Sequence, residues 1–327
     1  MRIMRFTGTW VLAVFAMILS QGTYGQTNPT YPTKPVRLVV PFSPGGATDV
    51  IARVLGQRLG ELWGQPVVIE NRAGATGGIA LEFVARSAPD AYVLLLGTAS
   101  THSFSPAINA KLAYNTVTDF APISLVATLP NMLVVHPSVP ADNVADFVAL
   151  VKANPGKFNF ASSGTGSSMH VGGELFNLMA GTSMTHVPYK GSGAAMADLM
   201  AGQIQLAFDS MPVVWPHVQA GRLKALGVAS TERHAAAPNV PAIAETVRGF
   251  EINSWIGIFA PANTPASLLR KISSDMERVA KLEDFRKKLF ELGATAVSNT
   301  PEEFAAFVTK DAEKWRKVVN AAGVTTK

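Results

Sequence analysis

The sequence contains no cysteine among its 327 residues. Disulfide bonds, a cysteine-linked lipid anchor and thiol chemistry are therefore excluded for this chain. Charged residues are also scarce, at 16% against 48% hydrophobic residues. This composition is typical of a globular protein with a large apolar core, and the length suits two lobes or domains.

Several signatures of enzymes and metal proteins are missing. There is no G-x-G-x-x-G motif, since Gly164-x-Gly166 lacks the third glycine, and no G-x-x-x-x-G-K, G-x-S-x-G or H-E-x-x-H motif. The six histidines are widely separated and lack the spacing of metal ligands, so we expect neither a metal nor another cofactor. No block of lysine and arginine alternates with aromatic residues, so we expect no nucleic-acid partner.

Residues 1–25 have the pattern of a secretory signal peptide. Arg2 and Arg5 precede an apolar run from Trp10 to Leu19, and the small residues that follow offer a cleavage site before Gln26. The run is short for a membrane span, which needs roughly 20 residues, although an uncleaved membrane anchor is the alternative. Removal of this segment lowers the formal charge from +5 to +3.

The rest of the chain alternates strand-like runs with amphipathic helices. The expected strands are 36–40, 66–70, 92–96, 158–161, 186–189, 204–208 and 223–228, with long extended stretches at 124–136 and 252–260. The expected helices carry apolar stripes such as Ile51, Leu55 and Leu59, and the last ones start near Thr264-Pro265 and at the capping box Thr300 to Glu303.

This order predicts an α/β protein of two lobes, each a β-sheet flanked by helices. The long extended stretches separate two β/α series, so we interpret them as strands that cross between the lobes. The predicted boundaries are 31–130 and 253–327 for the first lobe and 131–252 for the second, with the last helices packed on the first lobe.

A glycine turn joins the first strand to its helix. Glycine lets the backbone approach a ligand closely, and the helix N-terminus presents unpaired N–H groups at the positive end of its dipole. The turn therefore fits an anion site, whereas an ordinary tight turn with Asp49 stabilising the helix is the alternative. The candidate binding residues of this turn are Phe42, Ser43, Pro44, Gly45, Gly46 and Asp49.

A second turn of the same kind lies in the other half of the chain. Its hydroxyl groups and backbone amides suit a carboxylate, and its candidate residues are Ser163, Gly164, Thr165, Gly166, Ser167 and His170. Tyr189, Lys190 and Asp209 follow later strands of that half and could line the same cleft, although Lys190 could be a solvated lysine and Asp209 a structural cap. His170 could instead act as a base for Ser167 or Ser168.

The chain resembles the Bug family of periplasmic receptors, the extracytoplasmic components of tripartite tricarboxylate transporters. The resemblance extends from Tyr31 to the C-terminal helix, and its motifs are Tyr31-Pro-x-Lys34-Pro-Val-Arg37, Pro41-Phe42-x-Pro-Gly45-Gly46-x-x-Asp49, Glu70-Asn71-Arg72-x-Gly74 and Val187-Pro188-Tyr189-Lys190-Gly191. It implies a type II-like periplasmic binding protein fold in which two strand–turn–helix loops grip a carboxylate at the lobe interface, partly through water. It also implies that residues near Thr98 and Asp209 set the ligand.

We therefore predict a receptor, not an enzyme, that captures a small carboxylate and delivers it to a tripartite tricarboxylate-type transporter. The candidate ligands are di- and tricarboxylates, aromatic acids and acidic amino acids. We expect a monomer in the periplasm, whose protein partners are membrane subunits of the transporter. The alternatives are a periplasmic sensor for a signalling partner and a secreted serine hydrolase.

The leader predicts the processing of the chain. The mature protein should begin near Gln26 and appear in the osmotic-shock fraction of a Gram-negative host, because Arg2, Arg5 and the short apolar run direct export and cleavage. N-terminal sequencing of the purified protein checks this. Membrane-bound protein that still begins at Met1 would contradict it.

Overall fold

A computed structural model describes residues 31–109 and 111–321, so the predicted signal peptide lies outside the described residues. All elements belong to one unit that begins at Lys34. The strands are β1 (Val36–Val40), β2 (Val67–Asn71), β3 (Val93–Thr98), β4 (Phe120–Val135), β5 (Asn159–Ser162), β6 (Thr185–Pro188), β7 (Leu206–Ser210), β8 (Lys224–Val228), β9 (Asn253–Pro261) and β10 (Thr295–Ala296). The α-helices are α2 (Ala47–Trp63), α3 (Gly78–Ala85), α4 (Ser105–Ile108), α5 (Val144–Ala153), α6 (Ser168–Ala180), α7 (Ser192–Met200), α8 (Met211–Gln219), α9 (Ala266–Lys281), α10 (Glu283–Glu291) and α11 (Pro301–Ala321). Short 3₁₀ turns form η1 (Ala75–Gly77) and η3 (Ile243–Glu245), and a π-helical turn forms η2 (Ser100–Phe104).

The strands follow the order β2-β1-β3-β9-β4-β7-β5-β6, with β8 and β10 also paired to β4. Each predicted β/α series gives parallel pairs, which are β1 with β2 and β3, and β5 with β6 and β7. The long strands β4 and β9 are antiparallel to each other and to their outer neighbours β7 and β3. The predicted α/β class is therefore confirmed, with an antiparallel centre between two parallel flanks.

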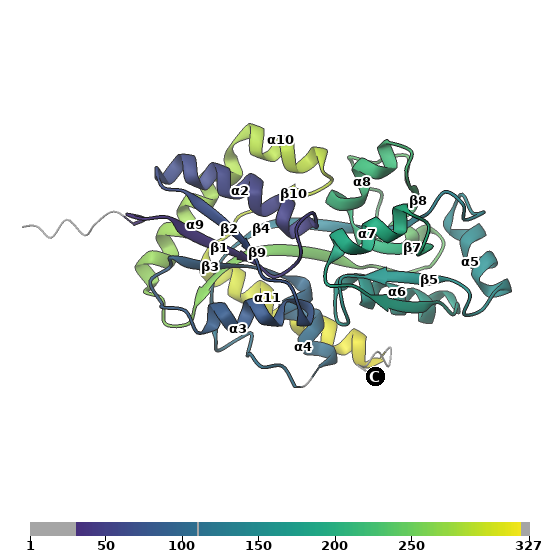
Figure 1. The fold of residues 1–327 in the computed structure, drawn as a ribbon, viewed down its shortest axis with the longest axis horizontal. Helices are drawn as coiled ribbons and strands as arrows, with labels where there is room; N and C mark the ends of the chain where they lie inside the picture. Colours follow the sequence, from purple (N-terminus) through teal and green to yellow (C-terminus); the bar gives the residue numbers. More distant parts are fainter. Residues whose placement is uncertain (1–30, 110, 322–327) are drawn as a thin grey trace, which may run out of the picture. The chain divides into compact units, whose positions relative to one another are not determined.

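Strand β4 belongs to both lobes. Its first part, as far as Pro130, pairs with β9, and its last part, from Asn131 to Val135, pairs with β7 and β8. The chain thus has the predicted two-lobe arrangement with a crossing strand, and Figure 1 shows β4 running from one group of strands into the other. The boundaries at 130/131 and 252/253 stay our proposal, which this change of partner supports.

Helices cover both faces of each lobe. In the first lobe α2, α9 and α10 lie on one face, and α3, α4 and α11 lie on the other (Figure 1). In the second lobe α7 and α8 lie opposite α6. Helix α9 contacts α2 and α11 contacts α4, which supports our assignment of the last helices to the first lobe.

Some helices are absent from the sequence-based prediction. Helix α8 contains Pro212 and Pro216, which hide its helical pattern because proline removes a backbone donor. Helix α10 buries only Phe285 and Leu289, and two apolar residues are too few to reveal a helical periodicity in the sequence. The sequence pattern predicts Pro265 as the first helical residue of α9. In the structure Pro265 is instead the N-cap residue.

The capping box at the start of α11 is confirmed. The Glu303 N–H donates to Thr300 Oγ1 at 3.2 Å, and the Thr300 N–H donates to Glu303 Oε2 at 2.9 Å. Phe304, Val308 and Trp315 are buried along the inner side of the helix, as expected from their spacing.

Two glycines leave room for aromatic rings on the first-lobe sheet. Gly97 of β3 lies directly opposite Gly257 of β9. The His102 ring stacks on Phe259 with centroids 4.0 Å apart, and a Cβ on Gly97 would lie 2.6 Å from both rings. A Cβ on Gly257 would lie 2.1 Å from the ring of Phe304 in α11. The absence of side chains at these positions therefore lets α11 and η2 pack closely on the sheet.

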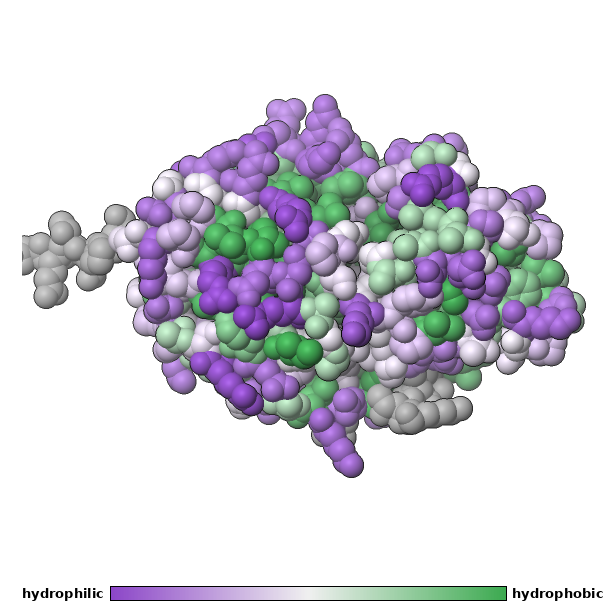
Figure 2. Space-filling view, in the orientation of Figure 1, coloured by the Kyte–Doolittle hydropathy of each residue, from purple (hydrophilic) through white to green (hydrophobic). Residues whose placement is uncertain are grey.

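The surface is mixed in polarity. On the face seen in Figure 2, hydrophobic residues form separate patches between hydrophilic ones. The large apolar side chains that are exposed come from different elements, among them Val68, Ile79, Leu178 and Phe290. A membrane-spanning helix, which needs a long apolar stretch, does not occur in the described ranges 31–109 and 111–321.

The glycine pair predicts a stability effect. Gly257→Ala should lower the free energy of unfolding by about 1–3 kcal/mol, because the added methyl overlaps the Phe304 ring in a close-packed core. The control is Gly60→Ala in α2, whose Cβ would make ordinary contacts at 3.5 Å or more and should not destabilise the protein. Urea unfolding of both variants checks this, and equal stability of the two would contradict it.

Candidate ligand-binding site

Helices α2, α6 and α7 each follow a strand after a short turn, α8 follows β7 directly, and the N-termini of all four meet at one cavity. The cavity has a volume of about 40 Å³. The first turn of α2 contributes Gly46, Ala47 and Thr48, and the first turn of α6 contributes Ser168 and Met169. Ser192 opens α7 and Ser210 caps α8. The remaining lining residues are Phe42, Thr98, Ser100, Leu129, Ser163, Asp209, Ser254 and Ile256.

Backbone donors are available at these helix starts. The first N–H groups of an α-helix have no partner within the helix. Helices α2, α7 and α8 begin at Gly46, Gly191 and Ser210 without a side-chain cap hydrogen bond. At α2 and α7 these N–H groups and the positive ends of the dipoles therefore remain available to an anion in the cavity, whereas at α8 the Ser210 N–H donates to Asp209 and Pro212 has no N–H.

The cavity contains one ionisable side chain among the described residues that line it. Asp209 lies at the end of β7 and is 1% exposed. Burial raises the pKa of Asp209 to about 6, against the opposing effect of hydrogen bonds from Ser192 and Ser210. Lysine, arginine and histidine do not occur among the lining residues of the described chain. The positive field of the site therefore comes from backbone dipoles and not from cationic side chains.

Residues of the two lobes touch around the cavity. Ser43 Oγ donates to the Lys190 carbonyl at 3.0 Å, Thr76 Oγ1 donates to the Thr165 carbonyl at 2.7 Å, and the Ser168 N–H donates to Ser100 Oγ at 3.1 Å. A Cβ on Gly193 would lie 2.4 Å from the Pro44 carbonyl oxygen. The structure thus holds the lobes in a closed arrangement.

The predicted site residues divide into three groups. Those that line the cavity are Phe42, Gly46, Thr98, Ser163 and Asp209. Those that line a neighbouring, more open depression are Gly164, Thr165, Tyr189 and Lys190, and this depression shares Phe42 and Ser163 with the cavity. Those that line neither are Ser43, Pro44, Gly45, Asp49, Gly166, Ser167 and His170.

Asp49 supports the first turn from behind. Its carboxylate accepts hydrogen bonds from the Gly45 N–H, Arg53 and Asn71 at 2.9–3.0 Å. Burial alone would raise the pKa of Asp49, but the hydrogen bonds from Arg53, Gly45 and Asn71 outweigh it and lower the pKa. Gly45 has the positive φ of this turn, at +85°, whereas Gly46 has φ −80°. In the structure Asp49 thus has the stabilising contacts that the sequence left as its alternative role.

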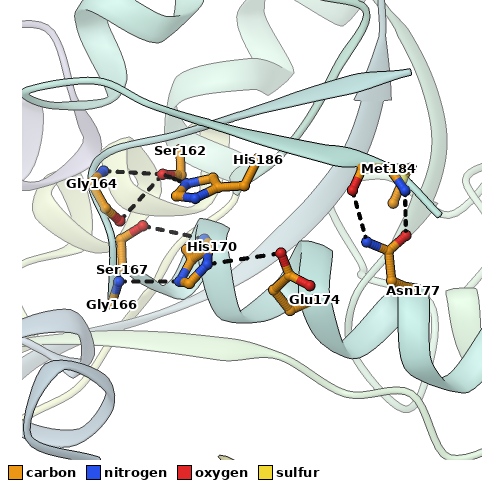
Figure 3. Close-up of polar contacts among 9 residues, drawn as sticks. All are labelled: Ser162, Gly164, Gly166, Ser167, His170, Glu174, Asn177, Met184 and His186. Carbon is orange, nitrogen blue, oxygen red and sulfur yellow. Dashed lines mark hydrogen bonds and ion pairs between the residues drawn. The ribbon is translucent and has the colours of Figure 1, made fainter. Parts of the chain in front are cut away.

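Ser167 and His170 support the second turn in the same way (Figure 3). Ser167 caps α6, because its Oγ accepts the His170 backbone N–H at 3.2 Å, and His170 Nδ1 accepts the Gly166 N–H at 3.2 Å. Among the described residues, neither Ser167 nor Ser168 makes a hydrogen bond to the His170 ring. The contact between nucleophile and base that a hydrolase needs is therefore absent here.

A second histidine lies beside His170. The rings of His170 and His186 have centroids 4.0 Å apart, and Ser162 Oγ lies 2.5 Å from His186 Nε2. Burial lowers the pKa of His170 to about 4, and burial together with the His170 charge lowers the pKa of His186 to about 3. Both rings are neutral at pH 7, so the turn rests on uncharged hydrogen bonds.

Three further serines, Ser168, Ser192 and Ser210, line the cavity, and the sequence places them in the same turns and strand ends as the candidate residues. Ser254 and Ile256 lie on β9 and carry no local signal, because only the sheet order brings β9 beside the cavity.

A cluster of three or more residues suited to a metal does not occur in the described part of the chain.

Comparisons with known proteins agree with this geometry. The model of the tripartite tricarboxylate transporter family receptor matches residues 51–324. The chain is 35% identical to Rpa4515 of R. palustris, solved with adipate, with TM-score 0.88 over 90% of this chain and 99% of that one. It is 32% identical to the periplasmic binding protein BugD, with TM-score 0.87 over 91% and 100% of the two chains. It is 33% identical to MatC of Rhodopseudomonas palustris, solved with malate, with TM-score 0.84 over 88% and 100%.

The histidine pair predicts acid sensitivity. Unfolded histidines take up protons near pH 6.5, whereas His170 and His186 do so only near pH 4 and 3, so stability present above pH 6.5 is lost as pH falls toward these values. For His170 the loss at pH 5 is about 2 kcal/mol in the free energy of unfolding. Urea unfolding at pH 7.5, 6 and 5 should show His170→Gln reducing this slope, while His136→Gln, outside the pair, leaves it unchanged.

Proposed function

Because the chain belongs to the receptor family of tripartite tricarboxylate transporters, we propose that its cavity captures a small carboxylate and that the liganded protein delivers it to membrane subunits of such a transporter. Members of this family are periplasmic solute-binding receptors and not enzymes, and so is this chain. The serine hydrolase alternative is therefore rejected.

The convergence of helix N-termini on one closed cavity is the observation that carries the proposal. Uncapped N–H groups from both lobes surround the same space, together with the hydroxyl groups of Ser100 and Ser168. These are the donors that a carboxylate requires, since its two oxygens accept about four hydrogen bonds.

Both lobes have to contribute for the ligand to be held. The first lobe offers the start of α2, and the second offers the starts of α6, α7 and α8. A small ligand that touches both sets makes contacts in the closed arrangement that an open one cannot provide, so binding shifts the population toward closure. The closed form is then the state that a transporter subunit recognises.

The ligand class follows from two solved relatives. Rpa4515 was solved with adipate and MatC with malate, which are small dicarboxylates. We propose the same class for this cavity, because it lacks cationic side chains among the described lining residues and its floor, with Leu129 and Ile256, is apolar. Presentation of the same closed form to a sensor kinase is the second candidate, and genes for transporter membrane subunits next to the gene of this protein would favour the first.

A ligand screen tests the proposal. Some small carboxylate at 100 times its dissociation constant should raise the free energy of unfolding by about 2.7 kcal/mol, whereas its methyl ester should not, because the ester is uncharged and attracts the helix dipoles less. Thermal shift of the mature protein measures both. Equal shifts for acid and ester would reject a carboxylate site, and Gly46→Val, which crowds Ser192 across the cavity, should abolish the shift.

A further inference from the structure

Asp209 places a carboxylic acid side chain in the cavity that we assign to a carboxylate ligand. It lines the space at the end of β7 and is 1% exposed, so water does not screen its charge. Among the described residues its partners are neutral donors, which are Ser192 Oγ, Ser210 Oγ and the Ser210 N–H. The electrostatic cost of this carboxylate is thus not offset by a cationic side chain.

Its hydrogen bonding leaves room for one more donor. Ser210 supplies two hydrogen bonds to Oδ1, at 2.7 Å from its N–H and 3.1 Å from its hydroxyl. Ser192 supplies the single hydrogen bond to Oδ2 from a protein group that the described chain contains. A carboxylate has about four acceptor positions, so one on Oδ2 remains for a group in the cavity.

An ionised carboxylate of the ligand cannot occupy that place. Two like charges that share a buried site repel strongly, and one of them takes up a proton. A hydroxyl or ammonium group of the ligand instead donates a hydrogen bond to Oδ2 and lowers the free-energy cost of burying the Asp209 carboxylate. The cavity is therefore asymmetric, with helix N-termini for the ligand's carboxylate and Asp209 for a donor.

We propose that Asp209 determines the specificity of the receptor by requiring a hydrogen-bond donor on the ligand, close to the ligand's carboxylate group. The receptor therefore prefers hydroxy- and amino-carboxylates to plain carboxylates. This inference rests on the proposed function. A plain dicarboxylate meets the requirement only when a proton lies between its second carboxyl group and Asp209.

The proposal also fixes the pH dependence for plain acids. The pKa of Asp209 lies at about 6, so Asp209 is ionised at pH 8 and increasingly protonated below pH 6. Plain dicarboxylates should therefore bind more tightly as the pH falls from 8 to 5.5. The histidines nearest the second turn, His170 and His186, have pKa values of about 4 and 3 and do not titrate in this window.

The test compares matched ligands on the mature protein by isothermal titration calorimetry at pH 8. Each set contains a plain, a hydroxy and an amino dicarboxylate. The four-carbon set is succinate, malate and aspartate, and the six-carbon set is adipate, 2-hydroxyadipate and 2-aminoadipate. In the set that binds, the amino compound should bind about 10–100 times more tightly than the plain one, as a hydrogen bond to a charged group predicts. Asp209→Asn should remove most of this preference and the pH dependence of the plain acid.

The variants distinguish a specificity role from a structural one. Asn is isosteric, and its Oδ1 can still accept from Ser210. Asp275→Asn is the matched control, because Asp275 is a 4% exposed carboxylate in α9 that bonds Trp63 and Lys271 and lies outside the cavity. It should change stability and not ligand preference.

Each outcome is decisive. Equal affinity of plain and amino compounds at pH 8, or an unchanged preference in Asp209→Asn, overturns the role of Asp209 while leaving the carboxylate site intact. Binding of none of these acids counts against the proposed function and this inference together.

Discussion

The site depends on strand β4 being hydrogen-bonded in both lobes at once. One strand of 16 residues, Phe120–Val135, pairs with β9 along its first part and with β7 along its last. Because this shared strand fixes the two parallel flanks end to end, helices that follow β1 in one lobe and β5, β6 and β7 in the other begin at the same place. Ligands of open α/β sheets bind outside the carboxyl ends of the strands, and here two such edges form one cavity.

The choice of backbone dipoles over cationic side chains suits a receptor that has to release its ligand. A lysine or arginine buried in the cavity would carry a large desolvation penalty when empty and hold an acid tightly when filled. Helix N–H groups are already oriented and do not need a buried charge. The interlobe hydrogen bonds of Ser43, Thr76 and Ser168 are also modest, each contributing about 0.5–1.5 kcal/mol, so closure remains reversible.

Polar residues behind the two turns give them their shape. Asp49, held by Arg53 and Asn71, fixes the first turn, and the pair His170 and His186 supports the second. These groups are not among the residues that line the cavity, so the lining side chains can change without loss of these supporting contacts. The ligand class can then be set by a few positions, of which Asp209 is the one with a charge among those described.

Periodicity, glycine turns and the capping box predicted most of the elements, the family resemblance and the places where helices follow strands, because these signals act over a few residues. They did not predict α8 or α10. The sequence named Phe42, Gly46, Thr98, Ser163 and Asp209, which line the cavity. It could not separate these from Asp49, Ser167 and His170 in the same turns, because consecutive residues of a turn point in different directions. Only the tertiary structure decided which of them face the ligand space and which support it. The tertiary structure also brought Ser254 and Ile256 to the cavity, because β9 pairs with strands that are far away in the sequence, and it placed Ser192 of α7 against Asp209.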